Sequence, residues 1–154
     1  MKIKIHTLSL VLLLTLTIFS CKKEKDDPAD EAVNTITLKI DNGSKITYKD
    51  ATGVVLANKL VIGGNNSDSD IQIIVDYDID QGTYTSTSEV GMSYGVNSKA
   101  VFTTATNVTS ISFEVSGHDT AAKHIQGHFT LNYMDNQNNN VTHTATGSFD
   151  ILYH

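Results

Sequence analysis

Gly91-Met92-Ser93-Tyr94-Gly95 has the G-x-S-x-G spacing of a nucleophile elbow, in which a strand-turn-helix presents a serine beside an oxyanion hole. Asp119 and His124 follow Ser93 in the order of a Ser-Asp-His triad. However, no helical pattern follows Gly95, and no alternation of strands and helices surrounds the segment. We therefore interpret the segment as a loop or strand bend, and keep a hydrolase that uses Ser93 only as a second alternative function.

Three aspartates, Asp76, Asp78 and Asp80, alternate along the chain as at the start of an EF-hand calcium loop. The glycine at the sixth position and the glutamate at the twelfth are both missing. A simpler interpretation is a strand segment with Tyr77 and Ile79 toward the core and the three carboxylates toward water. The aspartates remain the calcium candidate, because an ion would relieve the repulsion between three like charges.

His124 and His128 have the i, i+4 spacing of a helical zinc pair. The local pattern predicts a strand, along which four residues span about 13 Å, too far for both imidazoles to share one ion easily. His118 or His143 would have to complete such a site. We therefore expect exposed strand histidines on one polar face, and we predict no cofactor and no metal.

The elements that must position these side chains are short strands. Alternation with a period of two begins after Asn34, and clusters rich in Gly, Asn and Asp separate the apolar runs. One helical turn at most is expected, at Thr120–Lys123. The pattern predicts an all-β domain over residues 34–154, an antiparallel β-sandwich or small barrel of about 8–9 strands. The expected strands are Thr35–Ile40, a segment with Ile46 and Tyr48, Val54–Ile62, Ile71–Ile79, Gly82–Thr87, Ala100–Thr104, Ser110–Ser116, Ile125–Met134 and Val141–Tyr153.

The alternation also predicts which side chains are buried. Gly127 and Gly147 stand inside expected strands, where glycine marks a bulge or a close approach of the backbone. Phe129 and Phe149 are expected to meet as cross-strand core partners. The predicted core comprises Ile36, Leu38, Ile40, Ile71, Ile73, Val75, Ile111, Phe113, Val115, Phe129, Leu131, Tyr133, Phe149 and Ile151.

The only cysteine, Cys21, stands at the border between an apolar and a charged segment. A short positive end and the uncharged run Leu8–Phe19 are typical of a signal peptide, and the run is too short for a stable membrane span. Ile18-Phe19-Ser20-Cys21 resembles the bacterial lipobox. That resemblance implies a signal peptide over 1–20 and acylation of Cys21; the alternative is an ordinary secreted protein. The charged residues that follow predict a disordered tether over 21–33.

The net charge of the chain limits the classes of molecule that it can bind. Without Lys2 and Lys4, the chain from Cys21 keeps 9 of its 11 basic residues against 17 acidic ones, a formal charge of −8. Such a surface repels nucleic acid. The sequence also lacks a basic amphipathic stretch, so membrane contact is expected through the lipid alone.

The C-terminal third of the chain resembles small Bacteroidota lipoproteins that carry a β-rich domain of unknown function. Their glycine, aromatic and acidic pattern is matched here by Gly82-Thr83-Tyr84, Asp119, Ile125, Gly127, Phe129, Gly147, Phe149, Asp150 and Tyr153. The family contributes no activity. The lysines and Asp26-Asp27 after Cys21 resemble its surface-export signal, and Asp119-Thr120-Ala121 fits its O-glycosylation motif, which makes Thr120 a candidate.

Three function classes follow. We expect first a non-enzymatic cell-envelope lipoprotein, a binding or accessory module anchored to the outer membrane at the cell surface, with a protein or glycan partner. A surface glycan-binding module is the alternative; it would need an exposed row of tyrosines such as Tyr48, Tyr84 and Tyr94, because the chain has no tryptophan. The Ser93 hydrolase is the third class.

Overall fold

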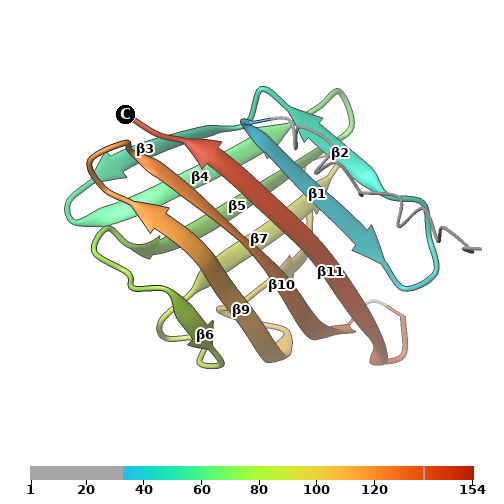
Figure 1. Ribbon diagram of the computed structural model, residues 1–154. Coiled ribbons are helices and arrows are strands. Elements are labelled where there is room, and N and C mark those ends of the chain that lie inside the picture. Colours follow the sequence, from blue (N-terminus) through green and yellow to red (C-terminus); the bar gives the residue numbers. More distant parts are fainter. Residues whose placement is uncertain (1–32, 137) are drawn as a thin grey trace, which may run out of the picture.

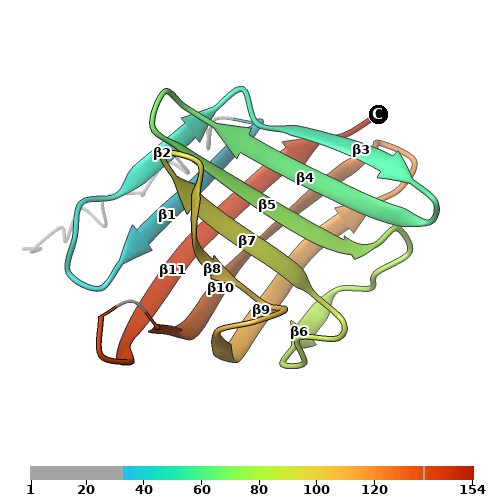
Figure 2. The same cartoon turned by 180° about the vertical axis from the view of Figure 1, so that it is seen from behind.

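The computed structural model describes residues 33–136 and 138–154, and it confirms the all-β prediction. Two antiparallel sheets pack face to face as a sandwich, and their strands cross one another in projection (Figures 1 and 2). In the described part of the chain, no helix is long and apolar enough to cross a bilayer.

The larger sheet contains the long C-terminal strands. It has six strands in the order β2-β1-β11-β10-β9-β6. Their bounds are Ile46–Lys49 (β2), Thr35–Ile40 (β1), Val141–Leu152 (β11), His124–Asp135 (β10), Val108–Asp119 (β9) and Gly82–Tyr84 (β6).

The second sheet has five strands in the order β3-β4-β5-β7-β8. Their bounds are Thr52–Leu56 (β3), Lys59–Asn65 (β4), Ser69–Asp76 (β5), Gly91–Val96 (β7) and Lys99–Thr103 (β8).

The prediction of one strand over Val54–Ile62 is wrong, because the chain reverses inside it. Ala57 and Asn58 both have positive φ, 48° and 63°, and join β3 to β4 as a two-residue hairpin. Such turns normally carry glycine at one of these positions. Because Ala57 is not a residue typical of such turns, the sequence pattern predicted one continuous strand across this position.

Gly91–Val96 is a strand, not a loop; it pairs with both β5 and β8, with a register shift against β8 between Tyr94 and Gly95. Its two glycines interrupt the apolar alternation from which strands were predicted. Two other expected strands end earlier, at Asp76 and at Tyr84. Thr120–Lys123 is a turn between β9 and β10.

The core lies between the two sheets, and the predicted core residues are buried with one exception. Ile40 is only partly buried, because β1 ends there and Asp41 turns the chain with φ 47°. The core also contains side chains that the prediction did not include, most of them from the five-stranded sheet: Leu60, Ile62, Met92, Tyr94 and Phe102. The six-stranded sheet adds Tyr48, Ile125 and Ala145, and residues outside the named strands add Ala51, Ile79, Val90 and Tyr153.

Phe129 and Phe149 do not face each other, so that part of the prediction is wrong. Phe129 stands opposite Gly147, and Phe149 stands opposite Gly127. Phe149 instead stacks on Phe113, with ring centroids 5.1 Å apart. The predicted bulge is present at Gly127, where the β9–β10 register shifts.

Both glycines are also positions of close approach. A Cβ at Gly127 would lie 2.7 Å from the Phe149 ring, and one at Gly147 would lie 2.4 Å from the Phe129 ring. Each phenyl ring therefore occupies the space that a side chain on the opposite strand would need.

Two sets of hydrogen bonds tie edge strands of the second sheet to the first. At the C-terminus, Tyr153 bridges Gly53 in parallel, and Val55 N–H donates to His154 O over 3.2 Å. At β8, the Asn107 amide donates to Val101 O and Met134 O over 3.0 and 2.9 Å. These contacts occupy backbone groups of Gly53, Val55 and Val101 on edge strands, where unpaired groups could otherwise pair with another chain.

Candidate functional site

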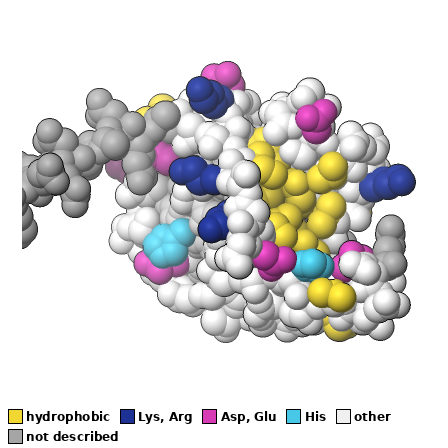
Figure 3. All heavy atoms as spheres, turned by 90° about the vertical axis from the view of Figure 1, so that its right-hand side faces the viewer, with side chains coloured by type: hydrophobic (Ala, Val, Ile, Leu, Met, Phe, Trp, Pro, Cys, Tyr) yellow, Lys and Arg dark blue, Asp and Glu magenta, His cyan; other side chains and the backbone are white. Residues whose placement is uncertain are grey.

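A hollow of about 350 Å³ lies where β7 and β8 meet the end of β10. Its residues are Val96, Asn97, Lys99, Ala100, Val101, Tyr133 and Asp135. Figure 3 views the side of the molecule on which the β1–β2 hairpin and the β7–β8 turn lie, and it shows hydrophobic side chains gathered there with charged and histidine side chains around them. The arrangement is an apolar floor with a charged rim.

Tyr133 lines the hollow but is only 3% exposed, so it closes the hollow toward the core. Its ring packs against Phe102, with centroids 5.2 Å apart, and Phe102 packs against Tyr94 at 5.6 Å. Burial raises the pKa of the Tyr133 phenol to about 12, with smaller contributions from Asp41 and Asp135. The phenol is therefore protonated at physiological pH and remains a hydrogen-bond donor.

A histidine-aspartate pair adjoins Tyr133. The His143 ring stacks on Tyr133 at 5.3 Å, and its Nδ1 lies 2.6 Å from Asp41 Oδ2. The hydrogen bond from His143, followed by that from the Thr144 N–H, holds the pKa of Asp41 below its ordinary value of 3.8. Asp41 is therefore a fixed negative charge at neutral pH.

These features suit binding by shape and polarity. A hollow of this size is at the lower end for ligand sites, and such sites combine apolar walls with a few placed polar groups. Here Val96, Ala100 and Val101 supply apolar surface, while Lys99 and Asp135 supply charges of opposite sign.

Ser93 lies in a different hollow, of about 220 Å³, on the outer face of the five-stranded sheet. Its lining residues are Gln72, Ile74, Gly91, Met92, Ser93, Thr103, Thr104 and Ala105, and none of these is a base. Asp119 and His124 are opposite each other in the β9–β10 register of the other sheet. The structure therefore does not assemble the triad that the residue order suggested.

The three aspartates point to solvent at the end of β5 and just after it, with Ile79 buried and Tyr77 partly buried, as the simpler interpretation expects, although the strand itself ends at Asp76. Asp76 pairs with Lys59 Nζ at 2.5 Å. Among residues 33–136 and 138–154, no three histidine, cysteine, aspartate or glutamate side chains are grouped to hold a metal ion.

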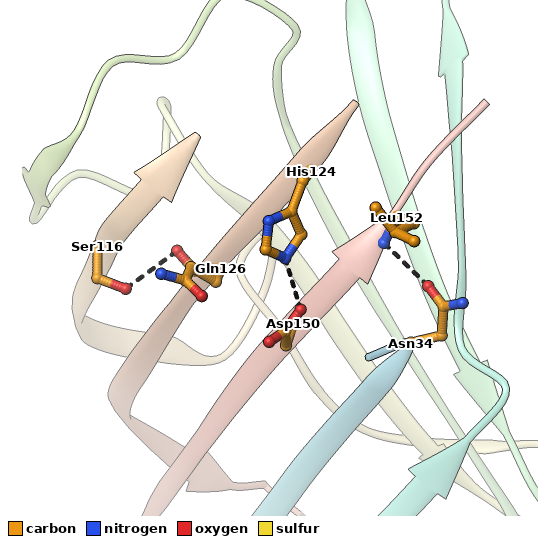
Figure 4. A network of polar contacts seen from close by, with 6 residues as sticks. All are labelled: Asn34, Ser116, His124, Gln126, Asp150 and Leu152. Atoms are coloured by element: carbon orange, nitrogen blue, oxygen red, sulfur yellow. Dashed lines mark hydrogen bonds and ion pairs between the residues drawn. The ribbon is translucent and has the colours of Figure 1, made fainter. Parts of the chain in front are cut away.

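Four described histidines, His118, His124, His128 and His143, contact different partners and do not form one cluster. On the outer face of the six-stranded sheet, His124 Nε2 lies 2.7 Å from Asp150 Oδ1, as Figure 4 shows, and His128 Nε2 lies 2.9 Å from Glu114. Between them, the backbone carbonyl oxygen of Gln126 accepts a hydrogen bond from the Ser116 hydroxyl. This strand face is polar and open to water, as predicted.

His118 links two parts of the chain from β9. Its Nδ1 lies 2.8 Å from Ile79 O, and its Nε2 lies 2.9 Å from the Tyr153 hydroxyl. Tyr153 belongs to the buried core, so His118 holds the segment after β5 against the C-terminus. We assign it a structural role.

The remaining candidates divide between exposed and buried positions. Thr120 is exposed in a turn in which Asp119 Oδ1 accepts the N–H groups of Ala121 and Ala122. Tyr48 and Tyr94 are buried, at 0% and 4% exposure, so they cannot stack on a sugar.

Tyr84 donates its hydroxyl to Asp80 O over 2.8 Å. The tyrosine row that the glycan-binding alternative needs is therefore not formed by these three side chains. Cys21 and the segments 1–20 and 21–32 lie outside the described residues.

Comparison with protein-family models finds no match to this chain, and comparison with curated proteins finds no similar sequence.

The hollow itself was not anticipated from the sequence. Val101 and Tyr133 fall in strands that the pattern did predict, but nothing in that pattern places the ends of those strands together. The contact between the end of β8 and the end of β10 involves Asn107, which donates to Val101 O and Met134 O and accepts a hydrogen bond from the Thr103 N–H over 2.9 Å. The only sequence signal was an asparagine in a polar turn, which is too common to indicate a bridge between sheets.

Proposed function

We propose that this protein is a non-enzymatic lipoprotein of the cell envelope, a binding or accessory module that holds a partner at the hollow beside Tyr133. The observation that carries the proposal is the apolar floor of Val96, Ala100 and Val101 on a rigid sandwich, with Lys99 and Asp135 at its rim. A partner that brings an apolar group to this floor gains by burial, and the rim charges orient it.

The anchor of this module is Cys21. The support is the sequence alone: a positive end, an apolar run and a small residue before the only cysteine. Two or more acyl chains would hold the chain stably on a membrane, where one would not. We place the protein at the outer membrane and at the cell surface, on the resemblance of its charged tether to an export signal, and we propose Thr120 as its glycosylation position.

Site-specific photo-crosslinking tests the binding surface. A photoreactive residue at Ala100, exposed at the hollow, should yield a discrete adduct in intact cells. The same residue at Thr130, exposed on the outer face of the six-stranded sheet, is the matched control and should not yield that adduct. Adducts that are identical at both positions, or a hollow that yields none, would show that the binding surface lies elsewhere.

A further inference from the structure

Five exposed aliphatic side chains lie along one edge of the sandwich, here called the apolar edge. Their exposed fractions range from 37% to 59%, although they come from three distant parts of the sequence. They are Val33, Val54, Val55, Leu56 and Leu152.

Hydrogen bonds fix these three segments against one another. Leu152 N–H donates to Asn34 Oδ1 over 2.9 Å, which places Leu152 beside the segment that carries Val33 (Figure 4). The next residue, Tyr153, bridges Gly53, the neighbour of Val54. Val54 and Leu56 alternate with Val55 along β3, so aliphatic groups occur on both sides of that edge strand.

Charge does not explain this edge. Lys59, which follows the β3–β4 turn, forms an ion pair with Asp76. Lys49 and Lys123 have Asp50 and Asp119 near them in the sequence, so this part of the chain carries no excess of positive charge. A partner would therefore be bound through apolar contacts rather than through electrostatic attraction.

The position of the edge in the chain identifies the partner. Val33 is the first described residue and follows Cys21 by twelve positions, a length of chain that spans at most about 40 Å. If Cys21 is acylated, as the proposed function states, the bilayer lies within about 40 Å of Val33, at this edge. Confinement raises the effective concentration, so that a small apolar surface suffices for contact.

We infer that the apolar edge rests on the lipid bilayer to which Cys21 is anchored, with its aliphatic side chains among the headgroups. Amphipathic surfaces of this kind enter a bilayer by about 5–10 Å. This contact adds to the lipid anchor and rests on it, and it replaces the expectation from the sequence that the membrane is contacted through the lipid alone. It also leaves the hollow beside Tyr133 at another side of the sandwich, away from the membrane (Figures 1 and 3).

Single tryptophans test the orientation, because the chain has none of its own. Leu152 and Val141 are both 43% exposed and are the last and first residues of β11. About 36 Å of strand separates them. Leu152→Trp and Val141→Trp, each in the full lipidated protein, would be compared in phosphatidylethanolamine and phosphatidylglycerol vesicles with brominated acyl chains.

Leu152→Trp should show a blue-shifted emission and bromine quenching several-fold greater than Val141→Trp. Vesicle flotation of the same samples reports the anchor separately. Protein that floats with equal quenching at both positions would overturn the docking and leave the anchor standing. Protein that does not float would overturn both.

Discussion

Replacing Phe149 by alanine is expected to lower the free energy of unfolding by about 3–5 kcal/mol. Phe149 is 2% exposed and points into the core from β11, a strand paired on both sides. Its ring stacks on Phe113 and fills the space over Gly127. Removing the ring leaves a cavity in the core. Because β11 is hydrogen-bonded to a strand on each side, it cannot move inward to fill that cavity. The loss is a large share of the roughly 5–15 kcal/mol that stabilises a typical domain.

Urea denaturation measures this loss, with Ser93→Ala as the control. Ser93 is only partly buried on the outer face of β7, and we assign it no part in the core, so its replacement should change the free energy of unfolding by less than about 0.5 kcal/mol. Equal and small shifts for the two variants would mean that the inner face of β11 is assigned wrongly.

Gly147→Ala is expected to destabilise the protein by about 1–3 kcal/mol or more, although it adds only one methyl group. A Cβ at this position would lie 2.1 Å from the carbonyl oxygen of Thr37 on β1 and 2.4 Å from the Phe129 ring. The first clash is with backbone, so β1 would have to move away from β11. Phe129 is 2% exposed and has little room to yield.

Gly63 offers the matched control inside another strand. The nearest atom to a Cβ at Gly63 is the Ile71 carbonyl oxygen at 4.0 Å, so Gly63→Ala should be neutral or slightly stabilising, because alanine has less conformational freedom to lose. Thermal melts of the two variants should differ clearly. A Gly147→Ala protein as stable as Gly63→Ala would contradict the phenylalanine-over-glycine packing described here.

Much of the fold could be predicted because one face of each strand is buried. Residues such as Ile111, Phe113 and Val115 alternate with polar neighbours, and a period of two is enough to assign them to the core. The alternation could not locate the Ala57-Asn58 turn, because the turn depends on backbone angles that alanine seldom adopts. Nor could it give the β10–β11 register, which places each phenylalanine opposite a glycine.

The site was less accessible to sequence reasoning than the fold. Motifs drew attention to Ser93, Asp76 and His124, whose surroundings in the structure are a strand face, an ion pair with Lys59 and a contact with Asp150. The hollow and the apolar edge, in contrast, are made by side chains far apart in the chain. Their residues have ordinary types at ordinary spacings, and only the pairing of the strands brings them together.

The proposal that Cys21 holds this β-module on a membrane is tested by the intact mass of the mature protein. We expect a chain that begins at Cys21 and carries acyl groups on its thiol and new amino terminus, whereas Cys21→Ser should carry neither. A mature protein with an unmodified Cys21, or one that still carries residues 1–20, would contradict it.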